Sequence, residues 1–199
     1  MVEGWHGWVG TTRGVVLITV AALPLAVLAV WALARRRRAA GVPSARARRM
    51  SLAEVGIVYG TVPWIWMIML PGEHPGTAPG RVSLIPLRDL IAVLSGNPVM
   101  ATVQVVGNML VFAALGFLAP LRFTALASVL RILALAAGCS TLVEVAQYVL
   151  RLDRVSSVDD VLLNAGGAAL AALASRRLWR ATPPNTSPDR PRSASAAGR

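Results

Sequence analysis

Apolar residues gather in five long runs along the chain, and shorter polar stretches separate them. Crossing the hydrocarbon core of a bilayer as a helix takes roughly 20 mainly apolar residues. Five runs reach or approach that length: Gly14–Ala34, Leu52–Leu70, Val99–Leu121, Ile132–Val149 and Val158–Leu178. The pattern therefore predicts an all-α, polytopic integral membrane bundle with about five transmembrane helices.

A shorter amphipathic pattern lies in the long connection between the second and third spans, residues 71–98. Ser83–Ser95 predicts a helix, with Pro86 in its first turn. Four apolar residues share one face at helical spacing: Leu87, Leu90, Ile91 and Leu94. A helix this short does not cross a bilayer, so we expect it to lie flat in the outer interface.

The composition agrees with a membrane protein and divides the chain into three parts. Hydrophobic residues make up 55% and charged residues 15% of the sequence, whereas soluble domains carry about 25% charged residues. A soluble enzyme and a nucleic-acid-binding module are therefore poor fits. We expect an N-terminal helix with a basic cytoplasmic linker in residues 1–50, a membrane domain in residues 51–179, and a disordered tail in residues 180–199, which is rich in Arg, Pro and Ser.

The basic residues predict the orientation in the membrane. All 20 are Arg, the net charge is +11, and the Arg residues cluster beside the apolar runs. With the N-terminus outside, fifteen Arg fall on the inner side and five on the outer side. Because positive charge is retained in the cytoplasm, we expect a multi-pass plasma membrane protein with its N-terminus outside and its C-terminus cytoplasmic. This rule also explains the basic excess without nucleic acid.

Polar side chains recur at helical spacing in the last three spans. The third span carries Gln104 and Asn108, the fourth carries Glu144 and Gln147, and the fifth carries Asp160 and Asn164. In the predicted orientation, these three stripes lie at one depth, in the outer half of the bilayer. A carboxylate inside a span costs roughly 2.5–3.5 kcal/mol on insertion scales. Glu144 should therefore face protein or a hydrated cleft.

Two interpretations of these stripes remain open. The polar side chains either line an outward-facing pocket, with Arg154 above it, or form interhelical hydrogen bonds that hold the spans together. Asp159 points about 100° away from Asp160 on a helix, so only Asp160 is assigned to the pocket. Gly167 continues the row of Asp160 and Asn164, where a small residue permits close helix packing.

Metal and cofactor chemistry is not predicted. His6 and His74 have no Cys or His nearby, and zinc sites need several such ligands at defined spacing. The sequence has one Cys, Cys139, and we find no phosphate-binding loop or nucleophile motif.

Two stretches of the sequence resemble the VanZ-like membrane protein family. They are GNMLVFAALGFLAPL at residues 107–121 and STLVEVAQYVLRLDRVSSVDDVLLNAGGAALAAL at residues 140–173. The positions that match the family pattern are Asn108, Phe112, Leu115, Gly116, Glu144, Gln147, Arg154, Asp160, Asn164 and Gly167. The segment SLIPLRDL also looks like the family's Leu-Ile-Pro element. Ala114 and Ala171 depart from the pattern, because the family often has Pro and Gly there.

The resemblance implies a role in the cell envelope, because the family takes its name from a protein associated with resistance to teicoplanin, a glycopeptide. It implies that the protein lowers glycopeptide sensitivity, with membrane lipids and a glycopeptide or a lipid-linked wall precursor as partners. It supplies no mechanism, ligand or oligomeric state.

Two other functional classes are compatible with the same residues. An intramembrane enzyme acting on a lipid or wall precursor would use Glu144 or Asp160 as its acid or base and Arg154 to bind an anion. A small transporter would use Glu144 to carry a proton. The enzyme requires Glu144, Arg154 and Asp160 to converge within hydrogen-bond range.

Overall fold

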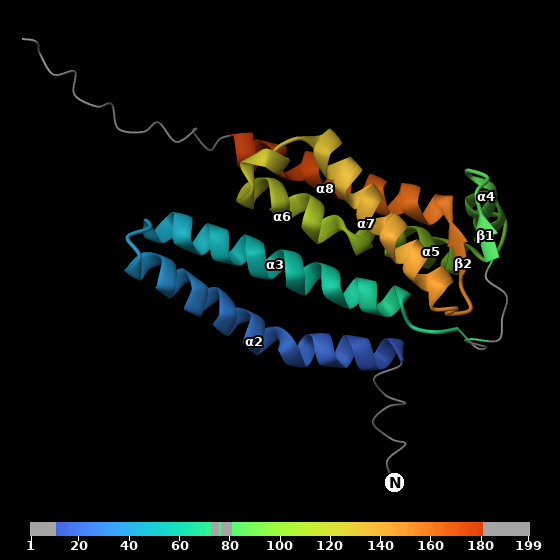
Figure 1. Cartoon of the computed structure of the whole chain (residues 1–199), viewed down its shortest axis with the longest axis horizontal. Coiled ribbons are helices and arrows are strands. Elements are labelled where there is room, and N and C mark those ends of the chain that lie inside the picture. The colour runs from blue at the N-terminus through green and yellow to red at the C-terminus, as the bar shows by residue number, and fades with distance from the viewer. Residues whose placement is uncertain (1–10, 73–75, 77–80, 181–199) are drawn as a thin grey trace, which may run out of the picture.

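The computed structural model describes residues 11–72, 76 and 81–180, and Figure 1 shows them as a helical bundle. The predicted all-α membrane fold is confirmed. In the described part of the chain, five helical stretches are long and apolar enough to cross a membrane. They are α2 (Thr12–Ala39), α3 (Ser44–Ile68), α5 and α6 together (Pro98–Val111 and Ala113–Arg122), α7 (Val129–Val149) and α8 (Val158–Arg180). The tail after residue 180 lies outside the described residues, as do His6 and His74.

The first two helices form a hairpin at one edge of the bundle (Figure 1). The basic stretch that the sequence analysis treats as a linker is helical except for residues 40–43, because α2 continues to Ala39 and α3 already begins at Ser44. Gly41 makes the turn possible with a φ of +82°, a left-handed conformation that glycine adopts without steric cost.

Polar contacts attach this hairpin to the rest of the bundle. The carboxylate of Glu54 on α3 accepts hydrogen bonds from Arg37 on α2 and from Arg122 on α6. Arg37 also donates to the Ser51 hydroxyl over 2.7 Å, and Tyr59 donates to the Thr19 carbonyl over 2.7 Å. One glutamate therefore connects three helices.

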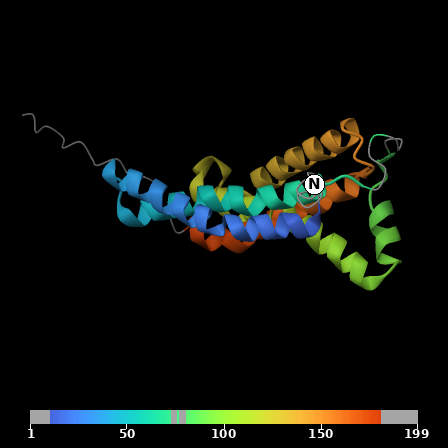
Figure 2. The same cartoon turned by 90° about the horizontal axis from the view of Figure 1, so that it is seen from below.

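The third span is not a continuous helix. It breaks at Phe112, where φ is −112° and ψ is 14°, and its two parts are the separate helices α5 and α6. Neither Gly nor Pro stands at the break, but the Phe112 ring is 1% exposed and belongs to the hydrophobic core. Figure 2 shows α5 leaving the direction of the bundle toward α4 (Arg88–Leu94).

Helix α8 is the central helix of the bundle. In its most apolar stretch of 18 residues, 44% of the residues are buried, whereas the corresponding stretches of the other spans are 6–22% buried. Two glycines allow its neighbours to approach closely. A Cβ atom on Gly167 would lie 2.0 Å from the carbonyl oxygen of Met109 on α5, and one on Gly116 of α6 would lie 2.1 Å from that of Ala168 on α8. The packing role expected for Gly167 is therefore present.

The segment before α5 differs from its prediction. A helix was expected over Ser83–Ser95, but α4 spans only Arg88–Leu94. Residues Arg81–Ser83 instead form strand β1, which pairs in parallel with β2 (Val155–Ser157) just before α8. Leu87 then adopts a φ of +66° before the helix begins. Strand pairing holds Arg81–Ser83 extended, so the helix can start only after this bend.

Candidate functional site

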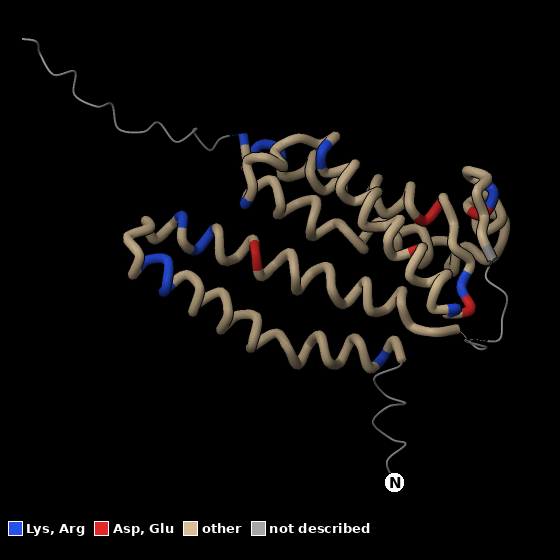
Figure 3. The backbone as a smooth tube through the Cα atoms, viewed as in Figure 1, with Lys and Arg blue, Asp and Glu red and all other residues tan. Residues whose placement is uncertain are grey.

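The acidic residues distinguish the two ends of the bundle (Figure 3). We call the end formed by β1, α4, β2 and the start of α8 the polar end, and we call the opposite end, at the α2–α3 turn and the end of α8, the basic end. Every acidic residue that the structure describes lies at the polar end, except Glu54. The polar stripes of the sequence analysis also meet at the polar end.

Asp160 and Asn108 join the fifth span to the third. The side-chain amide of Asn108 on α5 donates a hydrogen bond to the Asp160 carboxylate on α8. Both side chains are partly buried. The contact brings together two residues that the helical spacing assigned to facing stripes.

Glu144 faces protein, as its insertion cost requires. Its side chain is buried, and Oε2 accepts a hydrogen bond of 3.0 Å from the backbone amide of Ser157. The Ser156 hydroxyl donates to the Glu144 carbonyl, also over 3.0 Å. The glutamate thus connects α7 to the strand that leads into α8.

Asn164 and Ser140 form a further polar contact between α7 and α8. Ser140 lies one helical turn from Glu144 on α7, and Asn164 lies one turn from Asp160 on α8. The Asn164 amide donates to the Ser140 hydroxyl over 2.7 Å. Asn164 is 2% exposed, and its carbonyl oxygen has no hydrogen-bond partner among the described residues. A buried carbonyl without a donor costs free energy, so this oxygen is a place where a water molecule or another donor would be stabilised.

Gln147 and Arg154 connect to the end of α3 instead. Gln147 donates to the carbonyl of Ile68 over 2.8 Å, and Arg154 donates from Nε and Nη2 to the carbonyl of Leu70 over 3.2 and 3.1 Å. Within the described residues, Arg154 makes no hydrogen bond to Glu144 or Asp160. The three-residue convergence that an enzyme would require is therefore not formed.

Asp159 has a structural role that the sequence analysis missed. It is 3% exposed, and its two oxygens accept hydrogen bonds from the backbone amides of Leu87 and Leu90, the latter over 2.9 Å. The carboxylate thus fixes the start of α4 onto the start of α8. It can do so because the first backbone amides of a helix have no hydrogen-bond partner within the helix.

Ser157 reinforces the same connection. Its hydroxyl donates to the Asp89 carboxylate over 2.6 Å and accepts from the Asp159 amide over 3.2 Å, which caps α8 as expected for a serine at this position. Hydrogen bonds from Ser157 and Ser83 hold the pKa of Asp89 below its usual range. Because Ser157 also binds Glu144 through its backbone, it links α4, α7 and α8.

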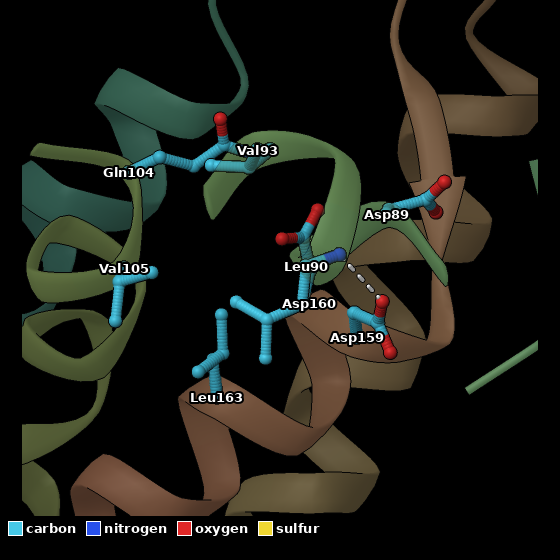
Figure 4. A pocket seen from close by; sticks show the side chains of 8 residues that line it. All are labelled: Asp89, Leu90, Val93, Gln104, Val105, Asp159, Asp160 and Leu163. Atoms are coloured by element: carbon cyan, nitrogen blue, oxygen red, sulfur yellow. Dashed lines mark hydrogen bonds between the residues drawn. The ribbon is translucent and has the colours of Figure 1, made fainter. Parts of the chain in front are cut away.

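A small, partly open pocket lies beneath α4, and the empty space in and around it, open solvent included, is about 220 Å³. Its polar lining consists of Asp89, Gln104, Asp159 and Asp160. Its apolar lining consists of Leu90, Val93, Val105 and Leu163. Figure 4 shows the Asp160 carboxylate between α4 and α5, whereas that of Asp159 lies beside the Leu90 amide.

This arrangement of polar residues coincides with a family match. The sequence pattern of the VanZ/LLP1 family matches residues 57–180, which is more than half of the chain. The chain belongs to the VanZ/LLP1 family. No curated protein and no solved structure matches it significantly. The match confirms the resemblance and, with the five apolar helices, identifies a VanZ-like membrane protein.

The matched VanZ/LLP1 region contains all the predicted site residues, but the structure divides them into groups. Gln104 and Asp160 line the pocket, and Asn108 binds Asp160. Asn164 and Gln147 form contacts between helices, and Glu144 binds the end of β2. Arg154 binds the carbonyl of Leu70, just after α3. Phe112 and Gly167 pack in the interior. Among the described residues, no group of three or more His, Cys, Asp or Glu is placed to hold a metal ion.

Proposed function

We propose that this VanZ-like protein lowers the sensitivity of the cell envelope to glycopeptides by binding a ligand in the pocket beneath α4. The observation that carries the proposal is the position of Asp160. Its carboxylate is directed into the pocket, and Asn108 fixes it by a hydrogen bond. A carboxylate held in this way binds a cationic or donor-rich group without further ordering. Candidate ligands are a glycopeptide and a lipid-linked wall precursor.

The proposal includes an orientation in which the polar end faces outward and the N-terminus lies outside the plasma membrane. The Arg residues at the basic end support it, because positive charge favours the cytoplasmic side. In a Cys139→Ala background, an impermeant maleimide should label Thr12→Cys in intact cells and Ser44→Cys only after permeabilisation. The reverse labelling pattern would show that the pocket faces the cytoplasm and would contradict the proposal.

The functional test compares glycopeptide susceptibility with protein abundance, in a strain in which the wild-type gene changes susceptibility. Asp160→Asn keeps a side-chain oxygen that can accept from Asn108 but removes the charge. Glu144→Gln similarly keeps an acceptor for the Ser157 amide. We expect Asp160→Asn to lose most of the resistance at normal abundance. Glu144→Gln, at a residue that does not line the pocket, and Ser95→Ala, at the exposed end of α4, should retain it. Full resistance of Asp160→Asn at normal abundance would refute a role for the pocket.

A further inference from the structure

The short helix α4 has three chemically different sides. At 100° per residue, Asp89, Leu90 and Val93 share one side, and these residues line the pocket. Leu87, Ile91 and Leu94 form a second side, which we call the apolar flank. Arg88, Ala92 and Ser95 occupy the third side, and all three are exposed. The helix therefore covers the pocket and at the same time presents an apolar surface.

The apolar flank is too exposed for a surface in contact with water. Leu87 is 52% exposed, and Ile91 and Leu94 are each 60% exposed. The preceding residues Leu84 and Ile85 are 74% and 56% exposed. Such a contiguous apolar surface marks a binding or membrane contact. It differs from the face predicted from the sequence, because Leu90 turns toward the pocket.

The apolar flank lies next in the chain to a helix of the third span. Helix α5 follows α4 directly and is part of the third span. Its side chains Val99, Met100 and Val103 are 63–67% exposed. Because these residues belong to a membrane span, lipid chains are their natural partner. The lipid leaflet that contacts these side chains of α5 would also cover the apolar flank of α4.

The chemistry of the pocket complements this position. Asp159 uses both oxygens to bind backbone amides of the α4 segment, and Asp89 binds Ser157. Asp160 accepts from Asn108 through one oxygen, and no described residue donates to the other. Its second oxygen is thus the acceptor available to a ligand, and aliphatic side chains form half of the pocket lining.

We infer that the pocket takes the headgroup of a bilayer-borne amphiphile with a protonated amine, and that its chain lies along the apolar flank of α4. The inference rests on the proposed function and specifies the class of its ligand. The amine would bind Asp160, and the ligand would reach the pocket from within the leaflet.

The first experiment measures whether lipid covers the flank. An environment-sensitive fluorophore is attached to Leu94→Cys or, as a matched control on the polar side of the same helix, to Ala92→Cys, both in a Cys139→Ala background. The protein is placed in phosphatidylcholine vesicles. Nitroxide-labelled phosphatidylcholine should quench the label at residue 94 at least about twofold more than the label at residue 92. Equal quenching at both positions would overturn the inference.

The second experiment measures the ligand class with the Leu94→Cys label. Dodecylamine should change its fluorescence saturably at concentrations at least about a hundredfold below those of ethylamine, because each buried methylene favours the membrane-bound ligand. Asp160→Asn should weaken the dodecylamine response about tenfold, and dodecanol should give no saturable response.

The outcomes separate this inference from the proposed function. If ethylamine matches dodecylamine in an Asp160-dependent way, the pocket binds a soluble cation and the membrane route is wrong. If dodecylamine gives no Asp160-dependent response while Asp160→Asn abolishes resistance, the proposed function stands and the ligand class is wrong. If Asp160→Asn retains resistance, the proposed function itself fails.

Discussion

The two ends of the bundle handle buried charge in opposite ways. At the basic end, the acid Glu54 is shared by two guanidinium groups from different helices. At the polar end, Glu144 and Asp159 accept hydrogen bonds from backbone amides. The basic end therefore matches charge with charge, whereas these two carboxylates of the polar end are matched with the peptide backbone.

The difference has a consequence for what each carboxylate requires. A carboxylate between two Arg side chains contributes through its charge, because removing it leaves both cations unpaired. A carboxylate bound to a backbone amide needs only an acceptor oxygen in the right place. Substitutions that remove charge without removing the oxygen therefore distinguish the two ends.

The largest effect is expected at Asp159. Asp159→Ala removes both acceptors for the α4 amides, and we expect a loss of about 3 kcal/mol in stability, since bonds to charged groups contribute about 1.5–3 kcal/mol each. Thermal unfolding in detergent measures this loss. Ser95→Ala should cost less than about 0.5 kcal/mol, because it removes only a bond within α4. Equal effects would mean that Asp159 does not hold α4.

A smaller loss is expected at the basic end. Glu54→Gln removes the charge between Arg37 and Arg122, whose side chains are only 19% and 24% exposed. Because solvent partly screens this triad, we expect a cost of about 1–2 kcal/mol in detergent unfolding. The difference from wild type should shrink in high salt. A difference that is independent of salt would contradict an electrostatic role.

The same substitution at the polar end should cost less. Glu144→Gln retains an oxygen that can accept from the Ser157 amide, so we expect a loss below about 1 kcal/mol, in keeping with the small values measured for interhelical hydrogen bonds. Measuring Glu54→Gln and Glu144→Gln side by side sharpens the comparison. A larger loss for Glu144→Gln would show that its charge also stabilises the fold.

The smallest effect concerns pH. Because hydrogen bonds lower the pKa of Asp89, its stabilising contribution is complete above the unfolded value of about 3.9 and is lost as the pH falls through the lower folded value. A label at Leu94→Cys should therefore report no loosening of α4 between pH 8 and pH 5. The change should appear only below about pH 4. Loosening near pH 6 would contradict this assignment.

Hydropathy and helical spacing predicted the spans and the burial of Glu144, because a bilayer imposes strong constraints on both length and polarity. The contact between Asn108 and Asp160 also follows from spacing, since each residue lies on a stripe directed at its neighbour. These features depend on the local periodicity of single helices. They are therefore visible in one sequence.

The features that escaped prediction depend on distant partners. Strands β1 and β2 are three residues each and pair across more than 70 positions, so neither shows an alternating pattern. Asp159 was set aside because it points away from Asp160, yet its partners are backbone amides that no side-chain pattern reveals. Arg154, which the enzyme alternative would use to bind an anion, donates to the carbonyl of Leu70, a backbone atom that no side-chain pattern reveals either.

The break at Phe112 gives the third span a joint at the depth of the core. Helix α5 has 14 residues and α6 has 10, which correspond to about 21 Å and 15 Å of rise. A continuous span adapts to bilayers of different thickness by tilting as a whole. Here a change in angle at Phe112 would take up such a mismatch through α5, which is itself held to α8 by the close approach of Met109 to Gly167 and by the Asn108–Asp160 hydrogen bond. Membrane thickness would then act on α5, the wall of the pocket that carries Gln104 and Asn108.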